Sequence, residues 1–488
     1  MKSKGKYVDW LIYLALLAAV YVTLLQPSYF TSRPHGDHAW AQCDRASVAL
    51  NYYQFNYPFT DPHTHNIVYN PSGIATGECP IIPFAVSKLY SLLGFHEYVF
   101  RLLTLLLSLP GLILSFFVAK RFLKSRALQI AASVIWVCSP NLIYYSTGFL
   151  PDNAALTFFV AGFYFLTKTE TPTFKNILLF SLLSTVGVLL KSSVLFLVAA
   201  VYIALLISAM VGGQLKPVFK KTLMLALPLV ACIGWIVFAK NSQLLYSSNV
   251  FKLGVVLPQN FNSVLQAIIS LVRNLPKLYP LTTMIGLGIL ALIYTRKFKA
   301  DNFLQVFTLT GFGLWLIFFV LMMRNAPHHG YYHVPFQFLA FTFLIGVCVI
   351  VERDNFQFSV NAILGLMITG IVSLGIHNFT LYNIASHTDF INEDWNTLEP
   401  TLRQAGIKNT DKVFTVYDQS YNISLYLMNQ RGWNCMEGVW DYYKTDGLKI
   451  CDYAVLTDSN FIKQEIVKPY FGEKIATHGS LLVYRLKH

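Results

Sequence analysis

The sequence predicts a polytopic α-helical membrane protein that ends in a small α/β domain. Of the 488 residues, 55% are hydrophobic and only 12% are charged, whereas a soluble domain carries roughly 25% charged residues. Apolar runs near the length that a bilayer requires recur up to about residue 377, and the composition then changes. The net charge of +13 is divided among short clusters between these runs, which excludes one basic patch of the kind that binds nucleic acid.

The apolar runs predict about eleven transmembrane spans within a transmembrane part at 1–384. Three lysines in MKSKGKY precede the first run, so we expect a cytoplasmic N-terminus. Strongly basic turns such as KRFLKSR then fall inside, and acidic or histidine-bearing segments fall outside. The first two expected spans cover about 8–25 and 101–119. The third ends near 144, the fourth runs from 152 to about 167, and the next three end near 191, 211 and 240. Two spans flank TRKFKADN, the tenth lies between 333 and 350, and the eleventh ends near 377.

The segment 27–96 is the one long polar stretch in the N-terminal part, and we expect it to be the first extracytoplasmic loop. It contains Asp37, Glu78 and several histidines, including a His63-x-His65 pair that we expect to be solvated. We interpret this loop as the floor of an active site on the outer face of the membrane.

From 385 to 488 the sequence predicts an extracytoplasmic α/β domain of about 100 residues, a normal domain size. KVFTVYD, DYAVLTD and GSLLVYRL are expected strands, and QSYNISLYLMNQRG is an expected helix. FIKQEIVKPYF suits a helix or a turn. The cysteine pairs Cys43–Cys79 and Cys435–Cys451 fall in the two external regions, where either disulfides or free thiols fit.

The predicted topology gathers ionisable residues from distant parts of the chain at one face of the membrane. These residues are Asp37, Glu78, Asp152, Lys191 and His328. Each one alone also fits a solvated helix end, but their common face favours a site. Lys191 stands between two apolar runs, where a lysine is costly and often functional.

Several motifs together resemble a known family. They are GDHAW with Asp37, the acid-x-Pro stretch GECPIIPF with Glu78, FLPDNAAL with Asp152, Lys191 between two spans, and HHGYYHVPF at the start of a late span. Over about 7–377 the chain is similar to glycosyltransferases of the GT-C fold, in the group of the protein O-mannosyltransferases and the lipid A aminoarabinose transferases. It departs from the Asp-Glu pair of many members, because His38 follows Asp37.

The resemblance implies transfer of a sugar, with inversion, from a polyprenyl-phosphate donor to a lipid, glycan or protein hydroxyl. By position, Asp37 would act as the base or would orient the acceptor, and Asp152 would support it. Lys191 would bind the donor phosphate, with Arg101 and Arg45 as alternatives, because a cation stabilises the phosphate that leaves. Candidate substrate contacts are Glu78, His328, Tyr331 and Tyr332; for the two tyrosines an interfacial anchor is the alternative.

No cofactor is required by this reading, but a divalent metal on Glu78 with His328 or His329 is an alternative, since carboxylate and imidazole bind zinc. No glycine-rich loop suggests a nucleotide-sugar site. A flippase for a lipid-linked saccharide is the rival function, and a membrane scaffold with a glycan-binding C-terminal domain is a third. The expected location is the bacterial inner membrane.

Overall fold

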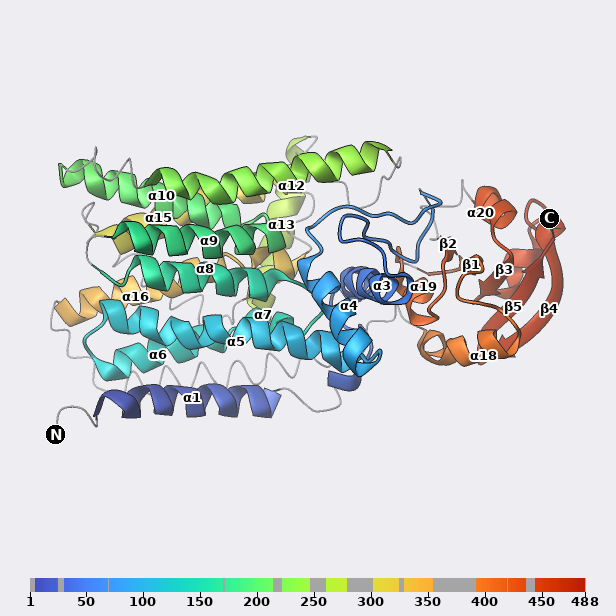
Figure 1. Cartoon of the computed structure of the whole chain (residues 1–488), viewed down its shortest axis with the longest axis horizontal. Coiled ribbons are helices and arrows are strands. Elements are labelled where there is room, and N and C mark those ends of the chain that lie inside the picture. Colours follow the sequence, from blue (N-terminus) through green and yellow to red (C-terminus); the bar gives the residue numbers. More distant parts are fainter. Residues whose placement is uncertain are drawn as a thin grey trace.

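The computed structural model describes residues 5–24, 30–68, 70–169, 172–213, 222–245, 260–278, 302–323, 329–353, 392–418, 420–435 and 444–487. A bundle of long helices forms one part and a C-terminal sheet domain forms the other, with the segment between the first and second spans placed between them (Figure 1). The expected fold class, a polytopic helical membrane protein with a small C-terminal α/β domain, is confirmed.

The helices of the bundle run along its length (Figure 1). They are α1 (Gly5–Leu24), α5 (Glu97–Phe122), α6 (Arg126–Val137), α7 (Pro140–Ser146), α8 (Asp152–Leu166), α9 (Phe174–Leu190), α10 (Val194–Val211), α12 (Ala226–Leu245), α15 (Phe303–Leu321) and α16 (Gln337–Arg353). Within the described residues, four helical stretches are long and apolar enough to cross a membrane, namely Glu97–Phe122, Val194–Val211, Leu223–Leu245 and Phe303–Leu321. The eighth and eleventh expected spans lie outside the described residues, so the number eleven stays a prediction.

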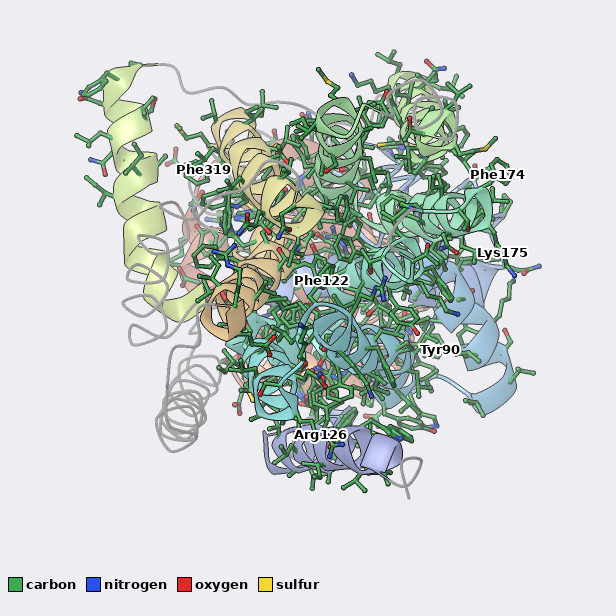
Figure 2. All side chains as sticks on the ribbon, turned by 90° about the vertical axis from the view of Figure 1, so that its left-hand side faces the viewer. Tyr90, Phe122, Arg126, Phe174, Lys175 and Phe319 are labelled. Carbon is green, nitrogen blue, oxygen red and sulfur yellow. The ribbon has the colours of Figure 1, made fainter. Side chains whose placement is uncertain are left out.

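Apolar packing and close helix approach hold the bundle together. Seen end-on, side chains fill the space between the helices (Figure 2). Gly111 lets α5 approach α8, since a Cβ at this position would lie 2.4 Å from Thr157 Oγ1. The expected third span is broken into α6 and α7, because Pro140 supplies no amide hydrogen and is suited to starting a new helix rather than continuing the first.

Two segments outside the expected spans contain helices. The segment 27–96 contains α3 (Ala39–Phe55) and α4 (Ile81–Leu93). Alanine and other helix-compatible residues in AWAQCDRASVAL outweigh the polar composition that suggested a loop. The segment after α12 contains the amphipathic α13 (Phe261–Leu278), whose Ala267 packs against Phe319 of α15. Figure 2 labels Phe319 on the side of α15 that faces α13.

The C-terminal domain is built on a sheet of five described strands in the order β2-β1-β3-β5-β4. β1 (Val413–Val416), β3 (Tyr453–Leu456) and β5 (Leu481–Leu486) confirm the three expected strands, while β2 (Gly432–Asn434) and β4 (Phe471–His478) were not predicted. β1 runs parallel to β2 and β3, and β5 is antiparallel to β3 and β4. The helices are α18 (Leu398–Gln404), α19 (Ile423–Leu427) and α20 (Lys444–Ile450), with short 3₁₀ turns in FIKQEIVKPYF.

The C-terminal domain docks on the segment that contains α3. The chain at His65–Ile67 lies beside β2 and exchanges two main-chain hydrogen bonds of 2.9 Å with Gly432. The Tyr426 hydroxyl in α19 donates to the Glu97 carboxylate at the start of α5, at 2.8 Å. These contacts place α19 beside α3, next to the end of the bundle (Figure 1).

Candidate active site

A cavity of about 260 Å³ lies where α3 meets the end of the bundle. Its walls come from α3, from the chain before and at the start of α4, from the turn before α8, and from the 3₁₀ turn η3 (Gly330–His333). The lining residues are Trp40, Asp44, Arg45, Val48, Pro62, Ala75, Gly77, Glu78, Cys79, Pro80, Ile82, Pro83, Phe149, Pro151, His329, Tyr331 and Tyr332.

One face of α3 points into this cavity. Trp40, Asp44, Arg45 and Val48 stand at positions i, i+4, i+5 and i+8, which places their side chains on one side of an α-helix. Asp44 is only 2% exposed. Sequence reasoning missed Asp44, because the segment was interpreted as a loop, in which no side chain has a defined facing. The helical spacing of Trp40, Asp44 and Val48 was the signal that could have identified it.

Four charged residues from distant parts of the chain form what we call the cavity cluster: Arg45, Glu78, Asp152 and Lys191. Glu78 accepts from Arg45 Nη2 and from Lys191 Nζ, each at 2.6 Å. Lys191 Nζ also lies 3.3 Å from Asp152 Oδ1. Lys191 is 4% exposed and Asp152 is fully buried, so these charges compensate one another away from water.

The electrostatics of Glu78 follow from its two cations. Burial raises the pKa of this carboxyl, but Arg45 and Lys191 together outweigh burial and lower the pKa to about 2. Glu78 is therefore ionised at neutral pH. An anion that enters the cavity would compete with Glu78 for the same two cations.

Two aromatic rings face the ammonium group of Lys191. Its Nζ lies 4.8 Å from the ring centre of Tyr331 and 5.2 Å from that of Tyr332, within the range of cation–π attraction. Lys191 ends α9, and α10 begins only three residues later, at Val194. The short link fixes the lysine at the end of two helices, where it meets η3.

Asp37 lies outside the cavity lining, near the start of α3. Its side chain is 54% exposed, and Oδ1 lies 2.8 Å from His38 Nδ1. The ring of His38 is 5.0 Å from that of Tyr331, which connects Asp37 to the cavity wall through one residue. The Tyr144 hydroxyl donates to the Asp37 carbonyl at 2.8 Å and so fixes the main chain at this point.

Arg101, one of the predicted phosphate ligands, is also outside the cavity lining. It is fully buried and donates to the carbonyl oxygens of Ser32, Arg33 and Thr147 at 3.1–3.2 Å. Its guanidinium lies 4.6 Å from the ring centre of Phe149. This engagement with the main chain ties the segment before α3 to the bundle.

A divalent metal on Glu78 with His328 or His329 stays a prediction. Both carboxylate oxygens already bind cations, and a dication there would face two positive groups within hydrogen-bond distance of its ligand. Within the described residues, no group of three or more His, Cys, Asp and Glu side chains could hold a metal ion. His328 lies outside the described residues. His329 lines the cavity, with its ring 5.2 Å from that of Trp40.

The structure also bears on the expected histidine pair and on the two cysteine pairs. His63 and His65 are 7% and 1% exposed, so the expectation of a solvated pair was wrong. Burial lowers the pKa of each to about 4, and the His65 ring instead contacts the Ser47 hydroxyl at 2.7 Å. Of the two thiol alternatives, the structure has free thiols, since Cys43, Cys79, Cys435 and Cys451 are all buried and unbridged.

Part of the chain that carries the cavity cluster matches a known family. Residues 77–238, which include Glu78, Asp152 and Lys191, match the family model of the dolichyl-phosphate-mannose-protein mannosyltransferases. No curated protein matches the chain. The resemblance to the mannosyltransferase group therefore has support from the family model as well as from the motifs.

Solved structures show the same fold at low sequence identity. ArnT from Cupriavidus metallidurans in the apo state is 12% identical, with a TM-score of 0.62, and the match covers 99% of this chain and 98% of that one. The same enzyme bound to undecaprenyl phosphate matches with a TM-score of 0.61 at 12% identity, with the same coverage. The Archaeoglobus fulgidus oligosaccharyltransferase, in complex with Zn and sulfate, has a TM-score of 0.58 and 10% identity over 96% of this chain and 71% of that one. The expected resemblance to GT-C glycosyltransferases is confirmed, and the chain is an integral membrane protein of this fold.

Proposed function

We propose that this protein is a glycosyltransferase that moves a sugar from a polyprenyl-phosphate donor to a hydroxyl group. The observation that carries the proposal is the cavity cluster, in which Arg45 and Glu78 line a cavity at one end of the bundle and Lys191, just outside the lining, binds Glu78. Two cations close together suit a phosphate, whose oxygens accept charge-assisted hydrogen bonds from both. The match to ArnT bound to undecaprenyl phosphate supports a lipid-linked phosphate as the ligand.

The donor phosphate would bind where Glu78 now bridges the two cations. Within the cluster, Arg45 and Lys191 balance Glu78 and Asp152, so a phosphate adds one negative charge unless Glu78 moves aside. Asp152 would keep Lys191 in place, because it is buried and reaches the same ammonium group. This assigns Asp152 a supporting role and the two cations the stabilisation of the leaving group.

The transfer needs a base on the side of the sugar opposite the phosphate. The acceptor hydroxyl would give its proton to a carboxylate, its oxygen would bond to the anomeric carbon, and the bond from that carbon to the phosphate oxygen would break with inversion. Polyprenyl phosphate would leave as a monoester. We assign the base to Asp37, which is exposed beside the cavity wall and can meet an acceptor from outside.

The acceptor would be a lipid, glycan or protein at the extracytoplasmic face of the membrane. The cavity lies at the end of the bundle next to the C-terminal domain, and the charge pattern assigns that end to the outside. A bacterial inner membrane, with undecaprenyl phosphate as the carrier, fits this placement. The Tyr331 and Tyr332 rings supply an amphipathic wall suited to a sugar.

Donor turnover tests the proposal. Purified protein in nanodiscs would receive radiolabelled undecaprenyl-phosphate sugars one at a time, with an outer-face lipid extract as the acceptor. We expect release of undecaprenyl phosphate with at least one donor. Asp37→Asn should reduce the release by about 100-fold or more, in line with loss of a general base.

The matched control is Asp61→Asn, which removes a carboxylate from the same segment at a position that does not line the cavity. It should retain release within about twofold. Release by Asp37→Asn at the wild-type rate would remove Asp37 from the base role. Movement of the labelled lipid across the bilayer without release from any donor would instead establish the flippase.

A further inference from the structure

Asp44 is a buried carboxylate whose hydrogen-bonding capacity is unused. It is 2% exposed and lines the cavity, yet neither of its oxygens has a hydrogen-bond partner within the described part of the chain. The guanidinium of Arg45 is 3.9 Å away, too far for a hydrogen bond. Buried polar groups without partners are rare and costly, so a group that enters the cavity is the expected partner.

Asn422 faces the same carboxylate from the C-terminal domain. It is fully buried, and neither its amide nitrogen nor its amide oxygen has a hydrogen-bond partner within the described residues. The Asn422 amide lowers the pKa of Asp44 through a weak side-chain hydrogen bond, which falls short of a well-formed partner for either group. Two orphaned polar side chains from different domains therefore meet beside one cavity.

The position of Asn422 is fixed by its surroundings. It is the residue before α19, which packs on α3. Its main-chain N–H donates to Ser420 Oγ at 3.3 Å, and the Asn66 amide holds the preceding carbonyl, that of Tyr421, at 2.5 Å. These bonds orient the loop independently of the amide group of Asn422, so that group is available to act on Asp44.

The chemistry around Asp44 suits the sugar of the donor. A carboxylate accepts a hydrogen bond from a hydroxyl, and Trp40 and Tyr331 supply aromatic faces in the same cavity. Asp44 lies next to Arg45, one of the two cations that face the donor phosphate. In an inverting transfer the acceptor approaches from the side opposite the phosphate, so a group close to the phosphate cations meets the donor sugar first.

We propose that Asp44 binds a hydroxyl group of the donor sugar and that Asn422 of the C-terminal domain is the positioning residue that orients the Asp44 carboxylate. The inference rests on the proposed function. It assigns the C-terminal domain a direct part in donor recognition, which nothing in the fold comparison supplies.

Kinetics with the donor varied at fixed acceptor, and then the reverse, test the assignment. Asp44→Asn should raise the donor KM by about tenfold to hundredfold, the effect of one charged hydrogen bond, and leave the acceptor KM within twofold. Asn422→Leu should raise the donor KM less. It should also move the pH midpoint of the donor KM upward, because Asn422 opposes the effects of burial, Glu78 and Asp418 on Asp44, as Arg45 does. Ile423→Val, a buried apolar change in the same helix α19, is the control and should alter neither.

A binding measurement separates this inference from the proposed function. Trp40 lines the cavity, so intrinsic fluorescence can follow titration with undecaprenyl phosphate and with undecaprenyl-phosphate mannose or glucose. Asp44→Asn should weaken only the sugar-bearing lipids. Equal weakening of bare and glycosylated lipid, or a change in acceptor KM alone, would overturn the inference and leave the glycosyltransferase standing. Sugar-selective binding that depends on Asp44, with no turnover of any donor, would instead sustain the inference and refute the function.

Discussion

Two buried charge clusters near the same end of the bundle use their charges differently. We call Arg33, Glu97, Arg101 and Tyr426 the docking cluster. Its groups bind main-chain carbonyls or one another: Arg101 holds the carbonyls of the segment before α3, and Glu97 holds Tyr426 of the C-terminal domain. In the cavity cluster, by contrast, cations and carboxylates face one another beside an open cavity.

A buried cation can be structural or can be available to a ligand, depending on its partner atoms. Arg101 and Lys191 are similarly buried, at 0% and 4% exposure, and sequence reasoning proposed both as phosphate ligands. The carbonyl partners of Arg101 belong to the main chain and cannot leave without unfolding a segment. The carboxylate partner Glu78 is a side chain at the cavity, and a ligand anion can replace it. Burial alone therefore does not distinguish a structural cation from a binding cation, but the partner atoms do.

The largest expected effect breaks the docking cluster. Arg101→Met removes charged hydrogen bonds to three carbonyls, each worth about 1.5–3 kcal/mol. We expect a loss of stability of about 4 kcal/mol or more, measured as a fall in Tm and in the yield of monodisperse protein. The control Lys449→Met removes an exposed ion pair with Asp446 at 3.9 Å and should cost about 1 kcal/mol or less. An equal effect of both variants would contradict the structural role of Arg101.

The next largest expected effect concerns the pKa of Asp44, which lies next to the cavity cluster. Burial raises its pKa to about 7, with Glu78 and Asp418 acting in the same direction and Arg45 opposing them. An acid with a raised folded-state pKa binds its proton more tightly when folded, so stability falls as pH rises from about 4 to 7. Between pH 5 and 7 the cost grows by about 2 kcal/mol, slightly less than 1.36 kcal/mol per pH unit, because the folded-state pKa lies at the upper end of this window.

Asp44→Asn should remove this pH-dependent loss of stability, because an amide does not ionise. We expect the variant to be more stable than the wild type at pH 8, with a much smaller advantage at pH 5, in parallel thermal unfolding measurements. The control Asp411→Asn, outside the cavity lining, should show no such pH-dependent gain. A constant difference at both pH values would show that Asp44 does not titrate in this window.

The cavity cluster itself is tested through ligand affinity. Lys191→Met should lower the affinity for undecaprenyl phosphate by about 100-fold, close to 2.7 kcal/mol, because it removes one charged hydrogen bond to the phosphate. Lys191→Arg keeps the charge and should lose much less. Arg101→Met, assayed at a temperature where it is folded, should bind the lipid as the wild type does. Normal affinity in Lys191→Met would remove this lysine from the phosphate site.

The smallest expected effect concerns the junction of the two domains. Glu97→Ala removes both contacts with the Tyr426 hydroxyl and should cost about 1.5 kcal/mol. Limited proteolysis should then cut the C-terminal domain faster, while Glu97→Gln, which keeps an acceptor oxygen, should resist. Affinity for undecaprenyl phosphate should stay within twofold in both, since neither residue lines the cavity. A large loss of lipid affinity would mean that the docking and cavity clusters are coupled.

Sequence reasoning recovered the parts of the site that depend on span ends. Asp152 opens α8 and Lys191 closes α9, and both positions follow from where apolar runs stop. Glu78, Tyr331 and Tyr332, which the family motifs indicated, line the cavity, whereas Lys191 is connected to it through Glu78 and Asp152 through Lys191. Asp44 was missed, because its role depends on α3 being a helix packed between the bundle and the C-terminal domain.

Hydrophobic length and periodicity are local properties of the chain, so the membrane character, the C-terminal α/β domain and the set of charges at span ends could be predicted from the sequence. Which of those charges meet depends on the tertiary packing. Glu78 and Lys191 are separated by 113 positions in the chain yet lie 2.6 Å apart, while Arg101 is engaged by carbonyls instead. Partner choice is set by the packing of α3, α8, α9 and η3 against one another, and no local pattern in the sequence encodes that packing.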